Sequence, residues 1–372
     1  MPRPSALDAA GAVAGRVTAG RVFDFAAAAS PTDLTFDLRG QQGRAMRFLL
    51  ALLLCVPSLP AAAQTARPRT ILFVGNSFTQ GALSAIRRYR PDTVTDLTRS
   101  GQGGVPALFK AFAEQAKLAY AVSHATQGGQ SLGFHYDQRR GLFDRAWDVV
   151  VLQEYSTLDA DRPGDASAYT RDAVRLAQMF SRANPAVQVQ LMATWSRADL
   201  TYRPGSPWSG KPVTAMANDL AAAARAIDAA SPEIDGVIPV GEAWSRAIAQ
   251  RVADSNPYDG IAFGQIDLWT HDQYHASVHG AYLEALVVFG KVTGVDPRTL
   301  GGQERAADDL GIAPAVAIAL QRVAAEQLAD QRASRSSVAV KAERPGSAGT
   351  SVAKNATPVP RSRSIQSPER RP

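Results

Sequence analysis

Short apolar runs alternate along this chain with longer segments in which apolar residues recur at helical spacing. The short runs predict strands at 70–75, 118–124, 147–152, 187–193 and 236–240. The periodic segments predict helices at 80–90, 105–116, 169–182, 213–229, 242–251 and 277–293. Strands and helices that alternate in this way indicate an α/β fold, in which helices cover both faces of a mostly parallel sheet.

The two ends of the chain lack this alternation. Residues 1–45 hold no convincing periodic element, and we expect a non-native or disordered extension there. Residues 331–372 are rich in Ser, Pro, Arg and Ala, so they cannot bury enough apolar surface to fold and predict a disordered basic tail. Residues 64–330 suit one catalytic domain, because single hydrophobic cores stop growing at roughly 250–300 residues.

A secretory signal peptide is predicted at 46–63. The segment opens with Met46 and a positive charge, continues with an apolar stretch at 48–56 that is too short to span a bilayer, and ends in three alanines suited to cleavage. We therefore expect translation to start at Met46, with a long charged leader as the alternative. The mature protein is expected to be periplasmic or secreted, with no stable membrane anchor.

Charge and cysteine content narrow the function. The net charge is +6, but much of it comes from the two ends. Residues 1–63 contain six Arg and four acidic residues, and residues 332–372 contain nine Lys or Arg and two Glu. The domain between these ends is therefore slightly acidic, which argues against nucleic acid as its partner. The only cysteine, Cys55, lies in the predicted signal peptide, so the mature protein is expected to have no disulfide.

Ser77 is the candidate nucleophile. It follows the first predicted strand in Gly75-Asn76-Ser77, where the glycine lets the chain turn sharply. The hydroxyl is then left at the carboxyl end of the strand, the edge at which open α/β sheets bind ligands. A serine at this place can also simply cap a helix, and a nucleophilic serine needs a base from elsewhere in the chain.

Asp272 and His275 are the candidate partners of this serine. They stand three residues apart, just before the last predicted helix. At this spacing a carboxylate can orient the imidazole that takes the serine proton. The three residues together predict nucleophilic catalysis.

The Gly-Asn-Ser block at 75–77 and the Asp-Gln-Tyr-His block at 272–275 resemble those of the SGNH hydrolases, also called the GDSL esterase family. That family carries its serine after the first strand and an Asp-x-x-His block before the C-terminal helix. The resemblance implies a three-layer flavodoxin-like fold, a triad of Ser77, His275 and Asp272, and no cofactor. The Gly-x-Ser-x-Gly motif of the α/β-hydrolases fits less well, because Thr79 replaces its second glycine.

The resemblance also implies an oxyanion hole made by the backbone N–H groups of Ser77 and Gly129 and by a side-chain amide. Gly129 lies in the Gly-Gly-Gln-Ser block at 128–131, which on its own is an ordinary Gly-rich turn. The family has Gly-x-Asn-Asp after the next strand, whereas this chain has Gln153-Glu154. A Gln amide offers the same N–H donors, so Gln153 is the expected substitute and a structural polar residue is the alternative. These departures make the chain similar to a divergent branch that includes acetylesterase-like relatives.

Three aromatic residues, Trp195, Tyr202 and Trp208, stand in a segment that is too polar and too Pro-rich for a core element. On an exposed loop they would stack on sugar rings as substrate-binding residues. They would otherwise anchor the loop to the body of the domain.

Two further histidines, His271 and His279, would lie on the same side of the helix as Asp272 and His275 if the segment were a continuous helix. Such a cluster would suggest a metal site. Such sites usually take a third ligand from elsewhere in the chain, and the resembled family needs no metal. We therefore expect no metal.

The sequence thus predicts an exported serine esterase that hydrolyses short acyl esters, most simply acetyl esters, of a small molecule or a polysaccharide. Polar residues, Gly and Pro dominate the segments that leave the strand ends, which favours a wet cleft over a broad apolar acyl channel. The alternatives are a lipase or arylesterase of the same family, an inactive carbohydrate-binding protein of this fold, and a metal-dependent hydrolase.

Overall fold

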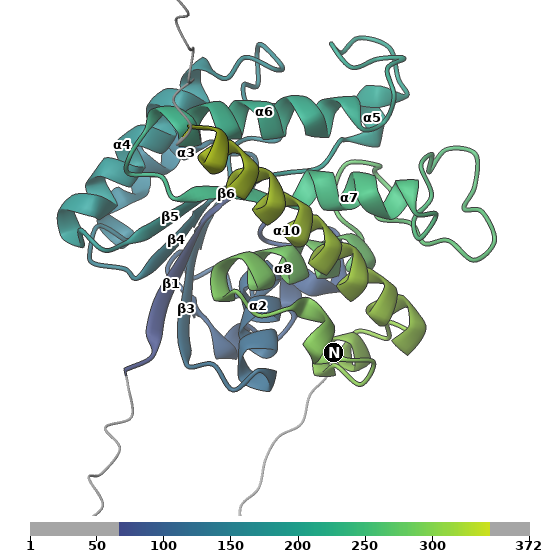
Figure 1. Cartoon of the computed structure of the whole chain (residues 1–372), viewed down its shortest axis with the longest axis horizontal. Helices are drawn as coiled ribbons and strands as arrows, with labels where there is room; N and C mark the ends of the chain where they lie inside the picture. Colours follow the sequence, from purple (N-terminus) through teal and green to yellow (C-terminus); the bar gives the residue numbers. More distant parts are fainter. Residues whose placement is uncertain (1–66, 343–372) are drawn as a thin grey trace, which may run out of the picture. The chain divides into compact units, whose positions relative to one another are not determined.

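Six parallel strands form the central sheet of the structure, a computed structural model that describes residues 67–342 (Figure 1). In space the strands follow the order β2-β3-β1-β4-β5-β6. Their bounds are β1 Arg69–Gly75, β2 Thr95–Asp96, β3 Tyr120–Thr126, β4 Val149–Leu152, β5 Gln188–Ala193 and β6 Gly236–Pro239. The predicted α/β class with a parallel sheet is confirmed. The predicted extension at 1–45 and signal peptide at 46–63 lie outside the described residues.

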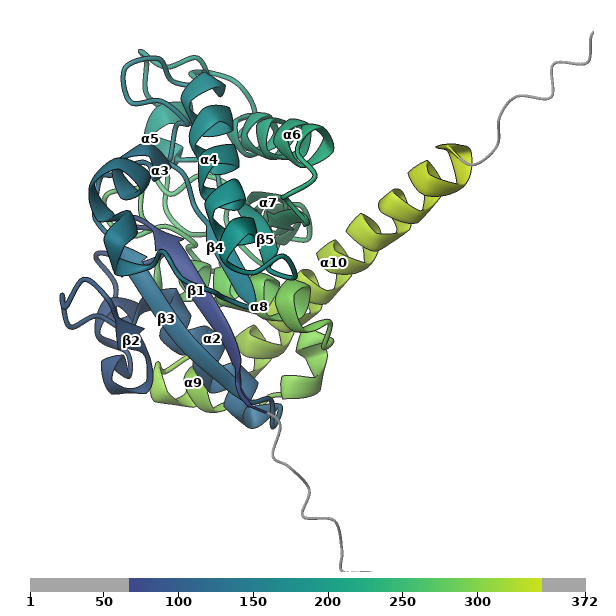
Figure 2. The same cartoon turned by 90° about the vertical axis from the view of Figure 1, so that its left-hand side faces the viewer.

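Helices cover both faces of this sheet and complete three layers (Figures 1 and 2). The helices α2, α7, α8 and α10 pack on one face, and α4 and α6 pack on the other. The bounds are α2 Gly104–Gln115, α3 Leu132–Phe134, α4 Ser167–Ala183, α5 Ala198–Thr201, α6 Ala215–Ala230, α7 Val240–Ala249, α8 Val278–Thr293, α9 Arg305–Asp309 and α10 Pro314–Ala342. None of the helices in this part of the chain is long and apolar enough to cross a membrane.

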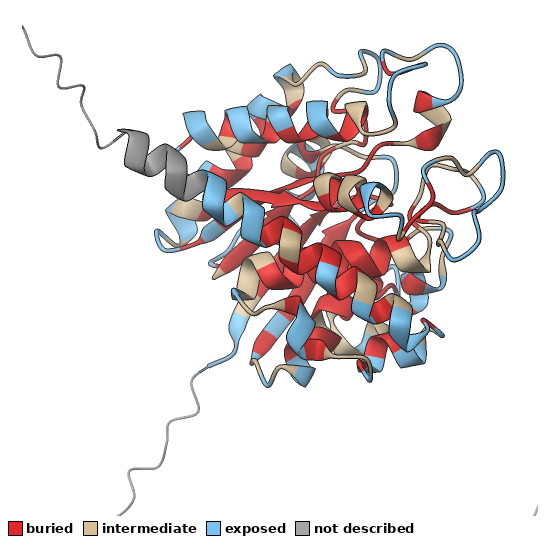
Figure 3. Cartoon of the chain, turned by 45° about the vertical axis from the view of Figure 1, so that its right-hand side comes forward, coloured by how far each residue is buried: buried red, intermediate tan, exposed pale blue. Residues whose placement is uncertain are grey.

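The apolar run of β1 is continuous because both faces of the strand are buried. Ile71 and Phe73 belong to the core on the α2 and α8 face, whereas Leu72 and Val74 belong to the core on the α4 and α6 face. Successive side chains of a strand point to opposite faces, so only an unbroken apolar run fills both cores. Figure 3 shows these buried strands between helices whose outer sides are exposed.

The position of β1 inside the sheet decides where a site can form. After β1 the chain builds β2 and β3 on one side of it, and then crosses to β4 on its other side. Without the two-residue β2, the order is that of flavodoxin-like sheets, in which ligands bind at the carboxyl edge where the connections diverge. The loops after β1, β3, β4 and β5 therefore surround one place at this edge.

Two predicted elements differ from the structure. The helix predicted at 80–90 is wrong, because Gly81 and Leu83 have φ values of +63° and +61°, and only a 3₁₀ helix forms at Ala85–Arg88. The tail predicted to begin at 331 is also wrong at its start, since α10 runs on to Ala342. The sequence of α10 is rich in residues that favour helices. The Gln331 amide of this helix donates to the Val237 carbonyl of the edge strand β6 at 2.9 Å. Residues 343–372 lie outside the described part of the chain.

Candidate active site

Ser77 lies in the turn that directly follows β1, at the carboxyl edge of the sheet. Gly75 is the last residue of β1, and a side chain would have no room at this position. A Cβ atom on it would stand 2.6 Å from Thr79 Oγ1 and 2.7 Å from Gln153 Oε1. Its φ is not positive, so space and not an unusual backbone angle requires the glycine that the sequence marked.

Asn76, the residue before the serine, ties this turn to both neighbouring loops. Its Nδ2 donates to the carbonyl of Gln130 at 3.0 Å and to the carbonyl of Glu154 at 3.2 Å, and its Oδ1 accepts from Phe78 N at 3.3 Å. The loops after β1, β3 and β4 are thus joined through one amide. No role for Asn76 was predicted from the sequence, although its place beside the candidate nucleophile was a signal.

The structure brings Ser77, His275 and Asp272 together. His275 Nε2 lies 2.9 Å from Ser77 Oγ, and His275 Nδ1 lies 2.7 Å from Asp272 Oδ2. The carboxylate favours the tautomer with the proton on Nδ1, which leaves Nε2 free to accept the serine proton. Ser77 is 9 % exposed, so only its outer side is open to a reactant.

Asp272 is held as an ionised carboxylate. Burial alone would raise its pKa, but hydrogen bonds from the Thr270 hydroxyl, the His275 ring and the backbone N–H groups of His275 and Tyr274 hold that pKa well below its ordinary value. The Thr270 hydroxyl lies 2.6 Å from Oδ1, and both backbone N–H groups donate to the same oxygen at 3.0 Å. The carboxylate therefore fixes the turn that carries the imidazole.

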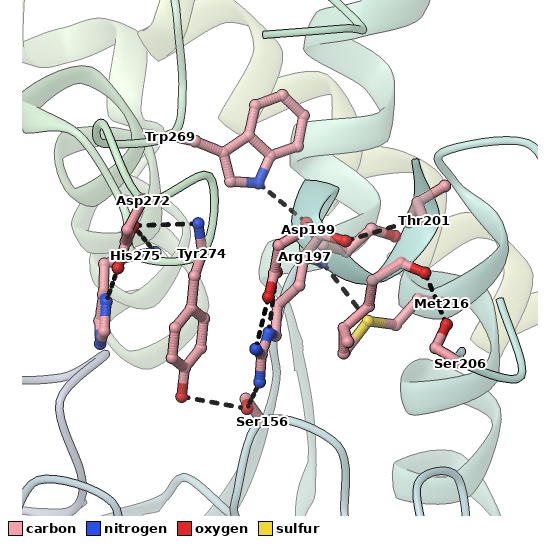
Figure 4. Close-up of polar contacts among 12 residues, drawn as sticks. Ser156, Arg197, Asp199, Thr201, Ser206, Met216, Trp269, Asp272, Tyr274 and His275 are labelled. Carbon is pink, nitrogen blue, oxygen red and sulfur yellow. Dashed lines mark hydrogen bonds and ion pairs between the residues drawn. The ribbon is translucent and has the colours of Figure 1, made fainter. Parts of the chain in front are cut away.

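Three residues that follow β5 hold this turn from outside, and we call them the bracket: Trp195, Arg197 and Asp199. Figure 4 shows Arg197 and Asp199 beside the turn. The Trp195 indole N–H donates to the Tyr274 carbonyl at 3.1 Å, and the Asp199 backbone N–H donates to the Gln273 carbonyl at 3.2 Å. The Arg197 guanidinium carbon lies 3.6 Å from the centre of the Tyr274 ring. Support is needed here, because Gln273 has a φ of +54°, which costs a residue with a side chain roughly 1–2 kcal/mol.

Arg197 and Tyr274 form a continuous link to the imidazole. Arg197 contacts Asp199 through Nε at 3.1 Å and through Nη2 at 2.7 Å, and its Nη1 donates to Ser156 Oγ at 3.2 Å. The Tyr274 hydroxyl lies 3.3 Å from the same Ser156 oxygen, and the Tyr274 ring centre lies 4.1 Å from that of His275. Arg197 and Asp199 were not predicted from the sequence; the signal was two opposite charges at alternate positions shortly after β5.

Backbone N–H groups are available on the other side of the serine. The Gln127 N–H donates to the Gly75 carbonyl at 3.0 Å, so the loop that carries Gly129 leaves β3 beside the serine turn. Gly129 is exposed with a φ of +71°, and a Cβ atom on it would meet no heavy atom within 4 Å. Within 67–342, the N–H groups of Ser77 and Gly129 have no hydrogen-bond acceptor. Neither N–H group is therefore committed to a partner in this part of the chain.

Gln153, predicted as the third oxyanion donor, has its side-chain amide in use. Its Oε1 accepts from Asn76 N at 2.9 Å and from Thr79 Oγ1 at 3.1 Å, while its Nε2 donates to the Glu154 carbonyl. The residue is only 1 % exposed. This placement favours the alternative that the sequence left open, a structural polar residue that shapes the serine turn.

Glu154 is a buried carboxyl beneath the oxyanion side of the site. Burial raises its pKa to about 7, although it accepts hydrogen bonds from the backbone N–H of Tyr155 at 2.6 Å and of Leu132 at 3.2 Å. The negative charge of Asp172 acts in the same direction as burial. Because Leu132 follows the Gly129 loop, the charge state of Glu154 bears on that loop near neutral pH.

The expectation of exposed, sugar-stacking aromatics is wrong for two of the three residues. Trp195 is 0 % exposed and stacks between Phe78 at 4.0 Å and Trp244 at 4.5 Å. Trp208 is 1 % exposed, and its indole N–H donates to Asp219 at 2.8 Å. Both rings anchor their loop, because a large apolar ring gains more from core packing than from solvent.

Tyr202 is the aromatic residue of this group that stays on the surface, with 41 % of its area exposed. Its ring makes an edge contact with Tyr258 at 6.1 Å between centres, and its hydroxyl donates to the Ser255 carbonyl at 2.7 Å. Burial raises the pKa of Tyr258, and the negative charges of Asp199 and Asp272 act in the same direction. Tyr202 directly follows α5, whose Asp199 N–H donates to the Gln273 carbonyl, so the aromatic pair lies near the turn that carries Asp272.

The histidines beside the triad do not form the continuous helical face that a metal site would use. Residues 271–275 form a turn, and α8 begins only at Val278. Within the described residues no group of three or more His, Cys, Asp or Glu is placed to hold a metal ion. A cavity of about 590 Å³ lies elsewhere, between α6, β6, α7 and α10, and none of its lining residues belongs to this site.

Comparison with known proteins gives distant likenesses. No protein-family model and no curated protein matches the chain. Among solved structures, a DUF4886 family protein from Bacteroides uniformis is similar over 70 % of this chain and 95 % of its own, with 18 % identity and a TM-score of 0.49. A candidate GDSL-like lipase from Parabacteroides merdae is similar over 61 % of this chain and 96 % of its own, with 17 % identity and a TM-score of 0.42. A two-domain esterase active on acetylated mannans is similar over 61 % of this chain and 50 % of its own, with 13 % identity and a TM-score of 0.39.

Proposed function

We propose that this protein is a serine esterase of the SGNH type, which hydrolyses a carboxylic ester by acyl transfer to Ser77. The observation that carries the proposal is the unbroken hydrogen-bonded chain from Ser77 Oγ through the His275 ring to the Asp272 carboxylate. A serine that merely caps a helix needs no imidazole at 2.9 Å and no ionised carboxylate behind it. The arrangement joins two segments far apart in the sequence.

The proposed reaction uses only groups of this chain. His275 takes the proton from Ser77 Oγ as the oxygen attacks the ester carbonyl, and Asp272 stabilises the imidazolium. The carbonyl oxygen, now negative, accepts hydrogen bonds from the N–H groups of Ser77 and Gly129; one such donor is typically worth about 2.7–4 kcal/mol. His275 then gives its proton to the leaving alcohol. Water then attacks the acyl-enzyme while His275 takes a proton from it. His275 returns this proton to Ser77 Oγ as the carboxylic acid leaves.

A short acyl group, most simply acetyl, is the proposed acid part of the ester. Phe78, the residue after the nucleophile, stacks on Trp195 and lies 5.3 Å from the Tyr274 ring. These rings are packed against one another and so form a closed wall beside the serine. The cavity between α6 and α10 shares no lining residue with the triad, so it offers no acyl channel.

A carbohydrate is the proposed alcohol part of the ester. The support is the half-exposed pair of Tyr202 and Tyr258, whose rings offer apolar faces and polar edges near the turn that carries Asp272. The test is a chain-length series of nitrophenyl esters beside acetylated xylan, scored by kcat/KM. A preference for acetyl with release of acetate from the polymer is expected. A preference for acyl chains of about eight carbons or more, without acetate release, would move the protein to the lipases or arylesterases.

The variant Tyr258→Ala sharpens this test. It should lower kcat/KM on acetylated xylan about fivefold, roughly the 1 kcal/mol of one aromatic contact, and leave turnover of nitrophenyl acetate unchanged. Ile318→Ala is the matched control, because Ile318 is an exposed apolar residue on α10. An equal loss on both substrates, or no loss on either, would remove Tyr258 from the carbohydrate site.

Export through the segment at 46–63 is also part of the proposal, and its support is the charged, apolar and small-residue order of that segment. Amino-terminal sequencing of the protein recovered outside the cytoplasm should begin near Gln64. A mature chain that retains the apolar stretch at 48–56 would contradict export by cleavage.

A further inference from the structure

We propose that Arg197 is a positioning residue, which holds the Tyr274 ring against His275 and thereby sets the distance from the imidazole to Ser77. The inference rests on the proposed function, because it concerns the same triad. It adds a residue that touches neither the serine nor the imidazole. Figure 4 shows Arg197 and Tyr274 side by side, with Ser156 joining their polar ends.

The contacts place Arg197 at the outer end of a short chain of packed groups. Its guanidinium lies 3.6 Å from the Tyr274 ring centre, and that ring also packs on the rings of His275 at 4.1 Å and Phe78 at 5.3 Å between centres. Tyr274 thus stands between a fixed cation and the ring that must move protons. A cation over an aromatic face attracts it, and a desolvated contact of this kind is among the stronger ones.

Arg197 itself cannot shift, since three of its nitrogens are engaged. Asp199 takes Nε and Nη2 in a two-pronged ion pair, and Ser156 takes Nη1. The Arg197 side chain is 14 % exposed. Because Asp199 neutralises it, the guanidinium offers no free charge for an anionic substrate, and its contribution is geometric.

The turn that Arg197 supports would relax without it. Gln273 holds a φ of +54°, and residues with side chains keep such angles only where their surroundings impose them. Relaxation at Gln273 would displace the next two residues, Tyr274 and His275. A displacement of about 1 Å between reacting groups can cost roughly 100-fold in rate.

The first experiment compares Arg197→Met with Arg197→Lys on nitrophenyl acetate. Arg197→Met keeps an unbranched apolar stem but loses the cation and the fork, and should lower kcat about 10- to 100-fold with KM within about twofold. Arg197→Lys keeps the charge alone and should recover part of kcat. A residue that bound substrate would instead raise KM with kcat unchanged.

The matched control is Arg69→Met. Arg69 also lies over a tyrosine, 5.7 Å from the Tyr120 ring centre, and donates to the Tyr120 hydroxyl at 3.2 Å, but it stands at the amino end of β1. This variant loses a similar contact at the opposite edge of the sheet. Its kcat should stay within about twofold of the wild type.

A double-mutant cycle tests whether Arg197 acts through Tyr274. In a Tyr274→Ala background, Arg197→Met should cause less than about a twofold further loss of kcat, because the ring that transmits its effect is gone. Additive losses in the cycle, or a normal kcat in folded Arg197→Met, would overturn the proposal. Asp199→Asn, which loosens the guanidinium while keeping most of the side chain, gives a second measurement of kcat if Arg197→Met does not fold.

The failure of this inference and the failure of the proposed function are separable. If Ser77→Ala were still active, the esterase mechanism through Ser77 would be wrong, whatever Arg197 does. If Ser77→Ala were inactive while folded Arg197→Met kept its kcat, the mechanism would stand and only the positioning role would fall.

Discussion

On one side of Ser77 the turn at 272–275 is held by hydrogen bonds to Asp272 and by the bracket of Trp195, Arg197 and Asp199. On the other side the Gly129 loop is exposed and has no packing atoms around the glycine. The first side would move protons, and the second would receive the oxyanion. One is packed tightly and the other is open.

The difference follows from what each side must contact. In the proposed mechanism His275 exchanges protons with the serine and the reactants through Nε2 alone, so the rest of the acid and base can be surrounded by protein and fixed before a substrate arrives. The oxyanion donors must reach an atom of the substrate, so their loop has to stay accessible. Substitutions around Asp272 and His275 should therefore change activity by moving the side chains of the proposed triad. Substitutions in the Gly129 loop should change activity by moving a backbone N–H group.

The largest effect is expected when the proton side loses its chemistry. Ser77→Ala and His275→Ala should each lower kcat for nitrophenyl acetate by about 10⁴-fold or more with the fold intact, because triad members act as a unit. Asp272→Asn should retain more activity. Near-native turnover in folded Ser77→Ala, established by circular dichroism and thermal unfolding, would show that the nucleophile lies elsewhere.

The two sides should also respond to pH with opposite sign. The pKa of Glu154 is raised in the fold to about 7, so its contribution to stability is present below its unfolded pKa of about 4.3 and is lost as pH rises toward 7. The pKa of Asp272 is lowered, so its contribution is present above an unfolded pKa of about 3.9 and is lost as pH falls.

Urea unfolding of the wild type, Glu154→Gln and Asp272→Asn at several pH values measures the contributions of both carboxyls to stability. The free energy of unfolding of the wild type relative to Glu154→Gln should fall by up to about 3 kcal/mol between pH 4.3 and 7. Relative to Asp272→Asn it should rise with pH in the acidic range. Two slopes of the same sign would contradict the contrast between these carboxyls.

Gln153→Ala decides between the two roles of this residue. The structural role predicts a loss of about 2 kcal/mol in the free energy of unfolding, because the Asn76 N–H and the Thr79 hydroxyl lose their acceptor, and a loss of less than tenfold in kcat. The oxyanion role predicts a loss of more than about 100-fold in kcat with stability and KM nearly unchanged. Chemical unfolding and steady-state kinetics on one preparation separate these outcomes.

The smallest effect on stability is expected at Gly129. Gly129→Ala meets no atom, so its cost is backbone strain of about 1–2 kcal/mol, and the displaced N–H should lower kcat about tenfold with KM little changed. Gly294→Ala is the control, since Gly294 has a φ of +74° and equally open surroundings at the end of α8. It should lose similar stability and keep its kcat. A loss of kcat in both variants would remove the case for a Gly129 donor.

The fold class and the residues of the candidate triad could be predicted from the amino-acid sequence alone. The apolar runs recur with the period of buried strands, and a strand such as β1 that is buried on both faces must be apolar throughout. Local spacing likewise marked Ser77 after its strand and placed Asp272 three residues before His275. These features are local, so a single sequence carries them.

The contacts made by the surrounding residues could be seen only in the tertiary structure. The same polar and Pro-rich segment buries Trp195 and Trp208 and leaves Tyr202 exposed, because burial depends on what lies opposite each ring and not on its neighbours in the chain. Gln153 and Asn76 have their amides directed by partners from other loops, and Arg197 gains its importance from a ring on a distant turn. Contacts between segments far apart in the sequence leave no periodic or spacing signal, so their geometry becomes visible only when the strands are assembled side by side.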